Sequence, residues 1–385
     1  MAKGRICVIT GSRAEYGLLY GVMRRIRDDP ELELRIVATG MHLSPEFGLT
    51  YQAIERDGFE IDEKVEILVS SDTPVGVAKS IGLGVIGFAD TLQRLQPDMV
   101  VVLGDRFETF AGALAAFIER IPIAHIGGGD VTEGAFDESI RHSITKMAFL
   151  HFVTNEGSRR RVCQLGEDPA RVFNVGHPGI DAIRRLRLLS RKELERALAF
   201  QFHPRNLLVT FHPVTMGRRD SATEFGELLN ALNRLGEGTG ILFTKPNADP
   251  EGRVLADMVD DFVAHHSNAK AFISLGQQHY FSAVRWVDVV VGNSSSGICE
   301  VPSLGRPTVD IGDRQKGRLR GNSVIHCEAQ TDAILRAIDC ALRFHGKIEN
   351  PYGDGTSSQK IVQEIKRHLY RGVRQQLKPF FEVGI

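Results

Sequence analysis

Short apolar runs rich in Val and Ile alternate with helical patterns along this chain, and this alternation limits its fold more than any other feature. In the first half the runs are 6–10, 34–39, 99–104, 122–127 and 150–155. Several are almost continuously apolar, as parallel strands are when helices cover both faces of their sheet. Strands that alternate with helices are typical of βαβ units. The pattern therefore predicts a doubly wound α/β domain.

A second series of apolar runs follows the charged stretch 184–196. Its members are 207–212, 240–245, 270–275, 287–292 and 307–312. A chain of 385 residues is too long for one ordinary core and suits two domains. We therefore expect two Rossmann-like domains, residues 1–185 and 186–355, with a hinge near 180–205. Ligands of such folds bind outside the carboxyl ends of the strands, so we expect both domains to face a cleft.

The last segment, 356–385, has a helical pattern of its own. Ile361, Ile365 and Leu369 recur at four-residue spacing and predict a long helix within 356–376. One arrangement for this C-terminal helix is to pack back on the N-terminal domain.

Charge and cysteine content exclude several classes of protein. The chain has 47 Lys and Arg against 48 Asp and Glu, so it has no overall positive field for nucleic acid. Its five cysteines are scattered, without the close pairs of a zinc site or a disulfide scaffold. The first apolar run ends at Gly11, too early for a membrane span or a signal peptide. We expect a cytoplasmic protein with no nucleic-acid or membrane partner.

Residues 82–87 match the GxGxxG spacing of dinucleotide-binding turns. That motif requires a strand before it and a helix that opens after it. Here the preceding residues, 70–81, have the pattern of a helix cap and a helix start. We therefore interpret these glycines as a flattened helix face and not as a cofactor site.

Polar residues follow the first and third predicted strands. Arg13 lies in a turn that leads into a helix, where backbone N–H groups and a guanidinium suit a pyrophosphate; an ordinary surface arginine is the alternative. Asp105 directly follows five apolar residues and should lie at the rim of the cleft. The alternative for Asp105 is to cap a helix over 106–119.

The segment 127–142 is the most informative of the chain. Three glycines permit close approach of the backbone to a ligand, and four carboxylates follow within nine residues: Asp130, Glu133, Asp137 and Glu138. A solvated acidic loop is one alternative. Asp137 and Arg141 are also spaced i,i+4, so a helical ion pair would account for those two residues alone.

In the second domain, His212 lies at the end of an apolar strand. It is either a residue of the functional site or a structural histidine. Ser294, Ser295 and Ser296 precede a helical pattern and would donate hydrogen bonds to phosphate; helix capping is the alternative. Glu300 follows and could accept both ribose hydroxyls.

Four cations lie within seven residues after the last strand of this series. They are Arg314, Lys316, Arg318 and Arg320. In a nearly neutral chain such a cluster indicates a phosphate clamp, with a solvated basic loop as the alternative.

Together these segments resemble one protein family. The matching motifs are TGSRAEYG, LGDRFE, the glycine run with Asp130, FDESIRHSITKMA, FHP, GNSSSG, EVPSLG and GDRQKGR, in family order from near residue 5 to about 325. They are similar to the hydrolysing UDP-N-acetylglucosamine 2-epimerases of bacterial sialic and legionaminic acid biosynthesis.

The resemblance implies a fold like that of B-type glycosyltransferases, with UDP held mainly by the C-terminal domain. It also implies the role of each site residue. The catalytic set would be Asp105, Asp130, Asp137 and His212, with Glu138 as a neighbour of uncertain role; the UDP-binding set would be Arg13, Ser294, Ser295, Ser296, Glu300, Arg314, Lys316 and Arg318. The family further suggests homodimers or homotetramers.

One position departs from the family pattern, which often has His-Ile-His-Gly-Gly-Glu where this chain has 125–130. Gly127 replaces the second histidine, and Asp130 replaces the longer acid. These two changes bear on the contacts to the sugar, so the substrate stays open between UDP-N-acetylglucosamine and UDP-N,N'-diacetylbacillosamine.

The expected reaction removes UDP from C1 and a proton from C2, and then adds water to the glycal intermediate. Paired carboxylates can supply the base and the acid, in an order that the sequence leaves open. Arg13, the serines and the basic cluster could stabilise the departing pyrophosphate, so we expect no metal and no NAD. The alternatives are a non-hydrolysing epimerase, a glycosyltransferase of the same fold and a UDP-sugar-binding regulator.

Overall fold

The computed structural model describes residues 3–69, 73–131, 136–213, 220–245, 250–370 and 378–382. The chain forms two compact units. The N-terminal domain combines Met1–Ala182 with Gly353–Ile385, and the C-terminal domain is Ile183–Tyr352. The boundaries predicted from the sequence, after residues 185 and 355, lie close to these divisions.

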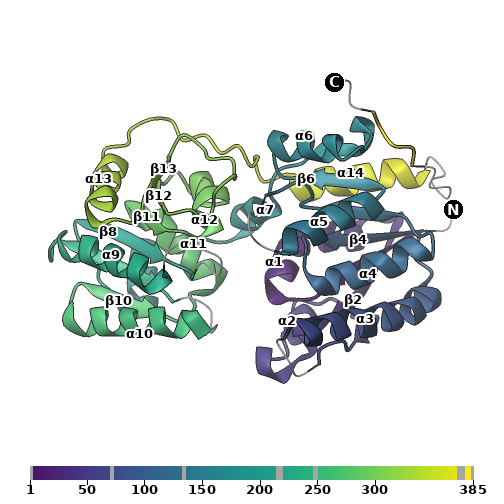
Figure 1. Ribbon diagram of the computed structural model, residues 1–385, viewed down its shortest axis with the longest axis horizontal. Coiled ribbons are helices and arrows are strands. Elements are labelled where there is room, and N and C mark those ends of the chain that lie inside the picture. Colours follow the sequence, from purple (N-terminus) through teal and green to yellow (C-terminus); the bar gives the residue numbers. More distant parts are fainter. Residues whose placement is uncertain are drawn as a thin grey trace. The chain divides into compact units, whose positions relative to one another are not determined.

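The N-terminal domain contains a seven-stranded parallel sheet of order β3-β2-β1-β4-β5-β6-β7 (Figure 1). The strands are β1 Gly4–Thr10, β2 Leu32–Thr39, β3 Glu63–Val65, β4 Met99–Leu103, β5 Ile123–Ile126, β6 Leu150–Val153 and β7 Val172–Asn174. The strand order reverses between β1 and β4, and in open α/β sheets ligands bind at the carboxyl ends beside such a reversal. Arg13 and Asp105 follow these two strands.

Helices cover both faces of this sheet. They are α1 Arg13–Asp28, α2 Tyr51–Arg56, α3 Pro74–Leu95, α4 Phe107–Ile118, α5 Phe136–Met147, α6 Glu156–Gln164, α7 Pro178–Arg185 and α14 Ser357–Tyr370, with short 3-10 turns η1 Gly40–Leu43, η2 Pro45–Phe47 and η3 Pro169–Arg171. Successive residues of β1 point to opposite faces, as strand geometry requires. Ile6 and Val8 join one buried core, and Cys7 and Ile9 join another. The doubly wound arrangement predicted from the apolar runs is therefore present.

Helix α14 belongs to the N-terminal domain although it follows the C-terminal domain in the sequence. Ile361, Val362 and Ile365 are buried in the same core as Ile6 and Val8. Lys366 Nζ also lies 2.8 Å from Asp29 Oδ2, at the end of α1. The helix predicted within 356–376 is thus found at Ser357–Tyr370 and packs on this domain, while residues 371–377 lie outside the described part.

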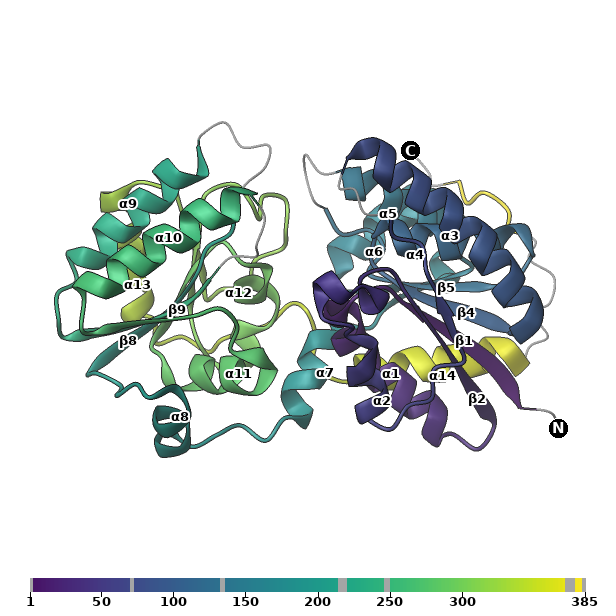
Figure 2. The ribbon, with the colours of Figure 1, turned by 90° about the horizontal axis from the view of Figure 1, so that it is seen from below.

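The C-terminal domain contains a six-stranded parallel sheet of order β10-β9-β8-β11-β12-β13 (Figure 2). Its elements are α8 Arg191–Leu198, β8 Arg205–Thr210, α9 Ser221–Asn233, β9 Thr239–Thr244, α10 Pro250–His265, β10 Ala269–Phe272, α11 Gly276–Trp286, β11 Val289–Gly292, α12 Ser295–Cys299, η4 Val301–Leu304, β12 Thr308–Ile311, β13 Val324–Cys327 and α13 Thr331–Leu342. Its strand order reverses between β8 and β11, which precede His212 and Ser294.

All ten predicted strands are present, and β3, β7 and β13 are additional. The glycines 82–87 lie inside α3, as the sequence interpretation required. A Cβ added to Gly84 would lie 2.8 Å from Cβ of Ala111, so this glycine permits α3 to pack closely on α4. The motif is a packing surface and not a dinucleotide turn.

Candidate functional site

Asp105 follows β4 at the strand reversal of the N-terminal sheet. Its carboxylate Oδ2 accepts a hydrogen bond from Arg141 Nη2 of α5, and the Arg141 side chain is only 5% exposed. Helix α4 has Arg106 as its N-cap residue, without a side-chain capping bond. The capping alternative for Asp105 is therefore wrong, and Asp105 is held by a buried cation instead.

Asp130 follows β5 and lies within the same network. Its Oδ1 accepts hydrogen bonds from Thr154 Oγ1 at 2.8 Å and Ser158 Oγ at 2.6 Å. Its backbone carbonyl accepts from Arg141 Nη1 at 2.6 Å. One guanidinium thus connects the segments that follow two neighbouring strands, and it fixes Asp105 and Asp130 relative to each other.

Asp137 and Glu138 occupy the first turn of α5, the helix that also carries Arg141. Burial raises the pKa of Asp137, and the negative charge of Asp105 raises it further. Glu138 Oε1 lies 3.8 Å from His142 Nε2. Because Arg141 binds Asp105 and the Asp130 carbonyl, its contacts extend beyond the i,i+4 pairing with Asp137 that was the alternative. Glu133 lies outside the described residues.

The turn after β1 differs from the anion site that the sequence suggested. Glu15 Oε2 accepts from the backbone N–H groups of Gly11 at 2.7 Å and Ser12 at 3.1 Å, while Ser12 caps α1. The expectation that these N–H groups bind an anion is therefore wrong, because a carboxylate already occupies them. Arg13 remains exposed and available. The Ser-x-x-Glu spacing at 12–15 is a capping-box signal that could have shown this.

Two buried acids lie beside this turn, and the sequence analysis did not identify them. Burial raises the pKa of Glu15 to about 7, and the charge of Glu108 adds to the effect. Glu108 is fully buried and pairs with Arg106 through two hydrogen bonds, of 2.9 and 3.2 Å. No spacing in the sequence marks Glu108 as buried, because it occupies a first-turn position where exposed acids are common.

His125 is a buried structural residue. Burial lowers its pKa to about 3, so the ring is neutral. Its Nε2 lies 2.8 Å from the carbonyl oxygen of Gly104, which can only accept, so the ring donates from Nε2. His125 thereby joins β5 to the segment that presents Asp105. The neighbouring Gly127 adopts φ 86°, a conformation that favours glycine at this position.

In the C-terminal domain, Asn293 joins the ends of β8 and β11. Its Oδ1 accepts from the backbone N–H of His212, and its Nδ2 donates to the backbone carbonyl of His212, both at 2.8 Å. Burial and the positive charge of Arg314 lower the pKa of His212 to about 4. The imidazole is therefore neutral at pH 7 and can accept a proton.

The serines 294–296 start the five-residue helix α12. Ser294 is the N-cap residue but makes no side-chain capping bond, so capping does not explain it. Ser296 Oγ donates to Glu300 Oε2 at 2.6 Å and contacts Tyr280 Oη at 3.1 Å. Ser296 and Glu300 thus bind each other, whereas Ser294 and Ser295 form no hydrogen bond through their hydroxyls with the described residues.

The basic loop after β12 is anchored to the end of β11. Arg314 Nη1 and Gln315 Nε2 donate to the carbonyl of Asn293, at 3.0 and 2.9 Å. Lys316 is exposed, and Arg318 Nη1 lies 3.9 Å from Cys299 Sγ. Arg320 instead pairs with the buried Asp310, at 2.8 Å. Three of the four predicted cations thus remain candidates for phosphate, and the fourth stabilises the fold.

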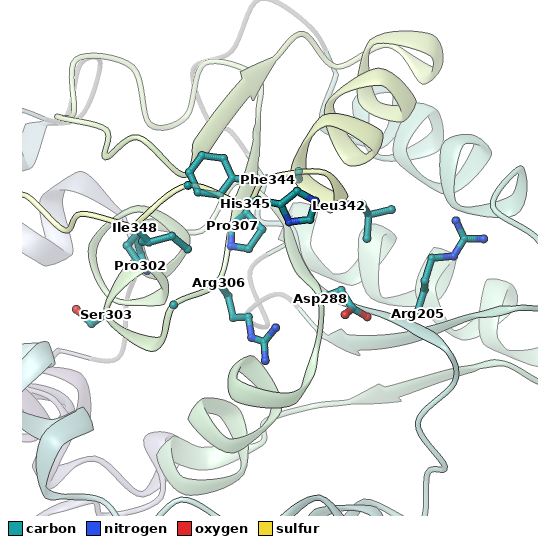
Figure 3. A pocket seen from close by; sticks show the side chains of 13 residues that line it. Arg205, Asp288, Pro302, Ser303, Arg306, Pro307, Leu342, Phe344, His345 and Ile348 are labelled. Carbon is teal, nitrogen blue, oxygen red and sulfur yellow. The ribbon is translucent and has the colours of Figure 1, made fainter.

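A cavity of about 720 Å³ lies elsewhere in the C-terminal domain (Figure 3). It is lined by Arg205, which starts β8, and by Asp288 and Pro307, which precede β11 and β12. These positions are the amino ends of the strands, opposite to His212. Two of its polar groups also have structural bonds, from Asn206 N–H to Asp288 and from Arg306 to the Arg285 carbonyl. The cavity is therefore separate from the candidate site.

Comparison with known proteins connects this geometry to a family. Residues 24–366 match the family described as UDP-N-acetylglucosamine 2-epimerase. The chain is 42% identical over 329 residues to a GDP/UDP-N,N'-diacetylbacillosamine 2-epimerase (hydrolyzing) of Campylobacter jejuni, covering 85% of each chain. It is 32% identical over 363 residues to the UDP-N,N'-diacetylbacillosamine 2-epimerase (hydrolyzing) of Legionella pneumophila, covering 94% and 95%.

The fold has a solved counterpart in the UDP-GlcNAc 2-epimerase of Neisseria meningitidis bound to UDP-GlcNAc. That structure matches with a TM-score of 0.74 and 20% identity, over 94% of this chain and 100% of the other. At this identity the likeness concerns the fold, which is the two-domain α/β fold expected from the resemblance. The chain is therefore an enzyme of the UDP-N-acetylglucosamine 2-epimerase family, and its relatives from Campylobacter and Legionella are named as hydrolysing enzymes.

Proposed function

We propose that the protein hydrolyses UDP-N,N'-diacetylbacillosamine to UDP and the free 2-epimeric sugar. The observation that carries the chemistry is a group of three acids: Asp105 and Asp130 follow neighbouring strands and are connected by Arg141, and Asp137 lies in the first turn of the helix that carries Arg141. The hydrolysing relatives from Campylobacter and Legionella, whose names specify diacetylbacillosamine, support the substrate.

In the first step a carboxylate takes the proton from C2 while the bond from C1 to the UDP oxygen breaks, which leaves a glycal. In the second step the hydroxyl of a water molecule adds to C1, and a proton adds to C2 on the opposite face. A base and an acid with separated pKa values suit these steps. Asp137, whose pKa is raised beside Asp105, is our choice for the group that changes protonation, with Glu138 as its neighbour.

We assign binding of the UDP group of the substrate to residues of the C-terminal domain and to Arg13. Ser294 and Ser295 would donate to phosphate oxygens, and Arg314, Lys316 and Arg318 would balance the charge of the departing UDP. Glu300 would accept the ribose hydroxyls, with Ser296 orienting it through their 2.6 Å hydrogen bond. His212, neutral and adjacent to Arg314, would act beside the leaving group.

UDP-N-acetylglucosamine is the second candidate substrate, because the matched family is described by that name. Gly127 and Asp130, which differ from the common family pattern, bear on this choice. The Campylobacter relative is named for GDP as well as UDP, so the choice between guanine and uracil as the nucleobase of the substrate also requires a direct test. We place the reaction in cytoplasmic sialic or legionaminic acid biosynthesis, catalysed by a homodimer or homotetramer.

Proton NMR in heavy water tests the proposal. The purified protein is incubated separately with UDP-diacetylbacillosamine, GDP-diacetylbacillosamine and UDP-N-acetylglucosamine. We expect free 2-epimeric sugar carrying deuterium at C2, with equimolar UDP, and the fastest turnover with the first substrate. A product still attached to UDP would instead identify a non-hydrolysing epimerase. Binding of the nucleotide sugar without reaction would favour a glycosyltransferase, tested by adding acceptors, or a regulator.

A further inference from the structure

Residues 378–382 form a C-terminal tail that contacts helix α5. Figure 1 shows the tail, drawn in yellow, beside the end of α6. Lys378 Nζ donates hydrogen bonds to the backbone carbonyls of Lys146 and Ala148, both at 2.7 Å, and lies 3.3 Å from the carbonyl of Thr145. These carbonyls belong to the last turn of α5 and to the residue that directly follows it. Lys378 therefore places a cation at the C-terminal end of α5, from 230 residues further along the chain.

The C-terminal end of α5 has a particular need for such a partner. The last four carbonyls of a helix have no partner within the helix, and the helix dipole makes this end favourable for a cation. Only Ala148 and Phe149 separate α5 from β6, and neither is the glycine that commonly closes a helix. Lys146, the basic residue of the last turn, directs its Nζ to Glu167. Lys378 thus supplies the donors and the positive charge from a distant part of the chain.

A buried carboxylate holds Lys378 in this position. Glu167 is 1% exposed, and its Oε2 lies 2.5 Å from Lys378 Nζ and 3.0 Å from His151 Nε2 in β6. A buried carboxylate that loses its cation is strongly destabilised, so this pair favours a docked tail. The ammonium group of Lys378 thus connects the segment after α6 to the end of α5.

The rest of the tail is fixed on Gly166, the residue before Glu167. The backbone N–H of Phe381 donates to the carbonyl of Gly166 at 2.9 Å. Gly166 has φ 83°, and a Cβ at this position would overlap the ring of Phe380, so the ring lies directly on the glycine. Chain ends are commonly disordered unless they are tied down. This one is tied at three successive points, which are Lys378, Phe380 and Phe381.

Contacts within the N-terminal domain connect this end of α5 to the proposed site. Thr145 Oγ1 donates to the Arg141 carbonyl at 3.0 Å and lies 3.3 Å from His125 Nδ1. Arg141 in turn binds Asp105, and His125 binds the carbonyl of Gly104. Helix α5 is about 18 Å long at the helical rise per residue, and it moves as one rigid element. A displacement at its C-terminal end would therefore change where Arg141 meets Asp105.

We propose that the C-terminal tail positions the active site, because Lys378 fixes α5 so that Arg141 meets Asp105 and the Asp130 carbonyl. Lys378 acts through the helix and is a positioning residue, not a catalytic one. The inference rests on the proposed function, in which the network around Arg141 organises the reacting acids. A displacement of about 1 Å can lower a rate about 10²-fold, so a small movement of α5 is measurable as a loss of turnover.

A tail that only stabilises the fold is the alternative. Its loss would lower the temperature of thermal unfolding and leave the kcat of the folded enzyme unaltered. The contacts favour positioning instead. Lys378 binds the end of α5, and this same helix carries Asp137 and Arg141, two of the residues assigned to the reaction.

Lys378→Met in the full chain tests the inference. Methionine has a similar length but lacks the charge and the donors, so we expect kcat to fall about tenfold while the Kd for UDP stays within about twofold of wild type. Phe380→Ala, which removes the ring from Gly166, should lower kcat about threefold. Lys3→Met, which replaces an exposed lysine before β1, is the control. Circular dichroism at the assay temperature verifies that each variant is folded.

Combination with Arg141→Gln separates positioning from stabilisation. If Lys378 acts through Arg141, the double variant K378M/R141Q should have a kcat within about threefold of R141Q alone, because the contact is already lost. The effects of the two substitutions would multiply if Lys378 acted independently of Arg141.

Hydrogen–deuterium exchange measured by mass spectrometry needs no substrate. In K378M we expect the amides of residues 142–148 to exchange at least about fivefold faster than in wild type, and those of α4 to be unaffected. Wild-type kcat in K378M or in R141Q, wild-type exchange in α5, or effects that multiply would each overturn the inference. A wild type that transforms none of the three nucleotide sugars would instead reject the proposed function, and the exchange rates would still show whether the tail holds α5.

Discussion

The two domains present their candidate site residues in different ways. In the N-terminal domain the acids are bound to other side chains, as Arg141 holds Asp105 and the Asp130 carbonyl, and Arg106 holds Glu108. In the C-terminal domain Asn293 fixes the backbone of His212. The hydroxyls of Ser294 and Ser295 form no hydrogen bond with the described residues, and Lys316 is exposed.

This difference matches what each kind of chemistry needs. Proton transfer depends on fixed positions and tuned pKa values, and a network of buried partners provides both. Binding a diphosphate depends on donors and cations that are free to meet it. We therefore expect substitutions of the acids and of Arg141 in the first domain to lower kcat, and substitutions of the serines and cations in the second to weaken nucleotide binding.

The largest effect is expected for Asp137→Asn, which removes the carboxylate proposed to change protonation. The kcat should fall about 10³-fold, while the Kd for UDP stays within about twofold of wild type. Initial rates and calorimetric titration with UDP measure the two quantities. Glu156→Gln, an exposed acid that starts α6, is the control. Turnover that survives in Asp137→Asn would remove this residue from the catalytic set.

Arg141→Gln tests the network itself. It leaves Asp105 without its buried cation and frees the Asp130 carbonyl, so we expect kcat to fall about 10²-fold. The free energy of unfolding should drop by about 2 kcal/mol, less than for a fully buried pair because Asp105 is partly exposed. Urea unfolding followed by fluorescence measures the loss. An unchanged kcat would mean that the acids do not require this connection.

Lys316→Ala tests whether the exposed cations of the C-terminal domain bind the diphosphate. Removing one exposed cation should raise the Kd for UDP about tenfold, or about 1.4 kcal/mol, with kcat nearly unchanged. Lys347→Ala, an exposed lysine of the same domain, should bind UDP like wild type. A fall in kcat without a change in Kd would contradict the division of roles.

The smallest expected effect is a shift in one titration. Burial and the charge of Asp105 raise the pKa of Asp137, so this group takes up its proton at higher pH than an ordinary aspartate. If it acts as a base, kcat/KM should decline as the pH falls through this raised pKa. In Asp105→Asn the pKa of Asp137 should move down, as carboxyl carbon-13 NMR can detect. No movement would show that the two acids are not coupled.

Most of the fold could be predicted because the central strands are apolar runs bounded by turns. The three strands that were missed, β3, β7 and β13, are three or four residues long, and β13 is half exposed, so none has a clear apolar pattern. All three are edge strands of their sheets, where the one neighbouring strand determines their structure more than their own residues do.

The positions of the candidate site residues were predictable from strand ends, but their partners were not. Arg141 and Asp105 are 36 residues apart, and only the packing of α5 against α4 and β5 brings them together. Glu15 likewise fills the turn that the sequence assigned to an anion, because a local capping box competes for the same N–H groups. The individual catalytic roles remain predictions that the variants above would test.

The return of α14 to the first domain has a consequence for how the protein is made. Ile361, Val362 and Ile365 complete the core around β1, so the ribosome must synthesise the chain beyond residue 365 before that core can close. The intervening domain, Ile183–Tyr352, is contiguous and can fold while the nascent chain is still attached. Newly made molecules should therefore pass through a stage in which the second domain is complete and the first still awaits its last helix.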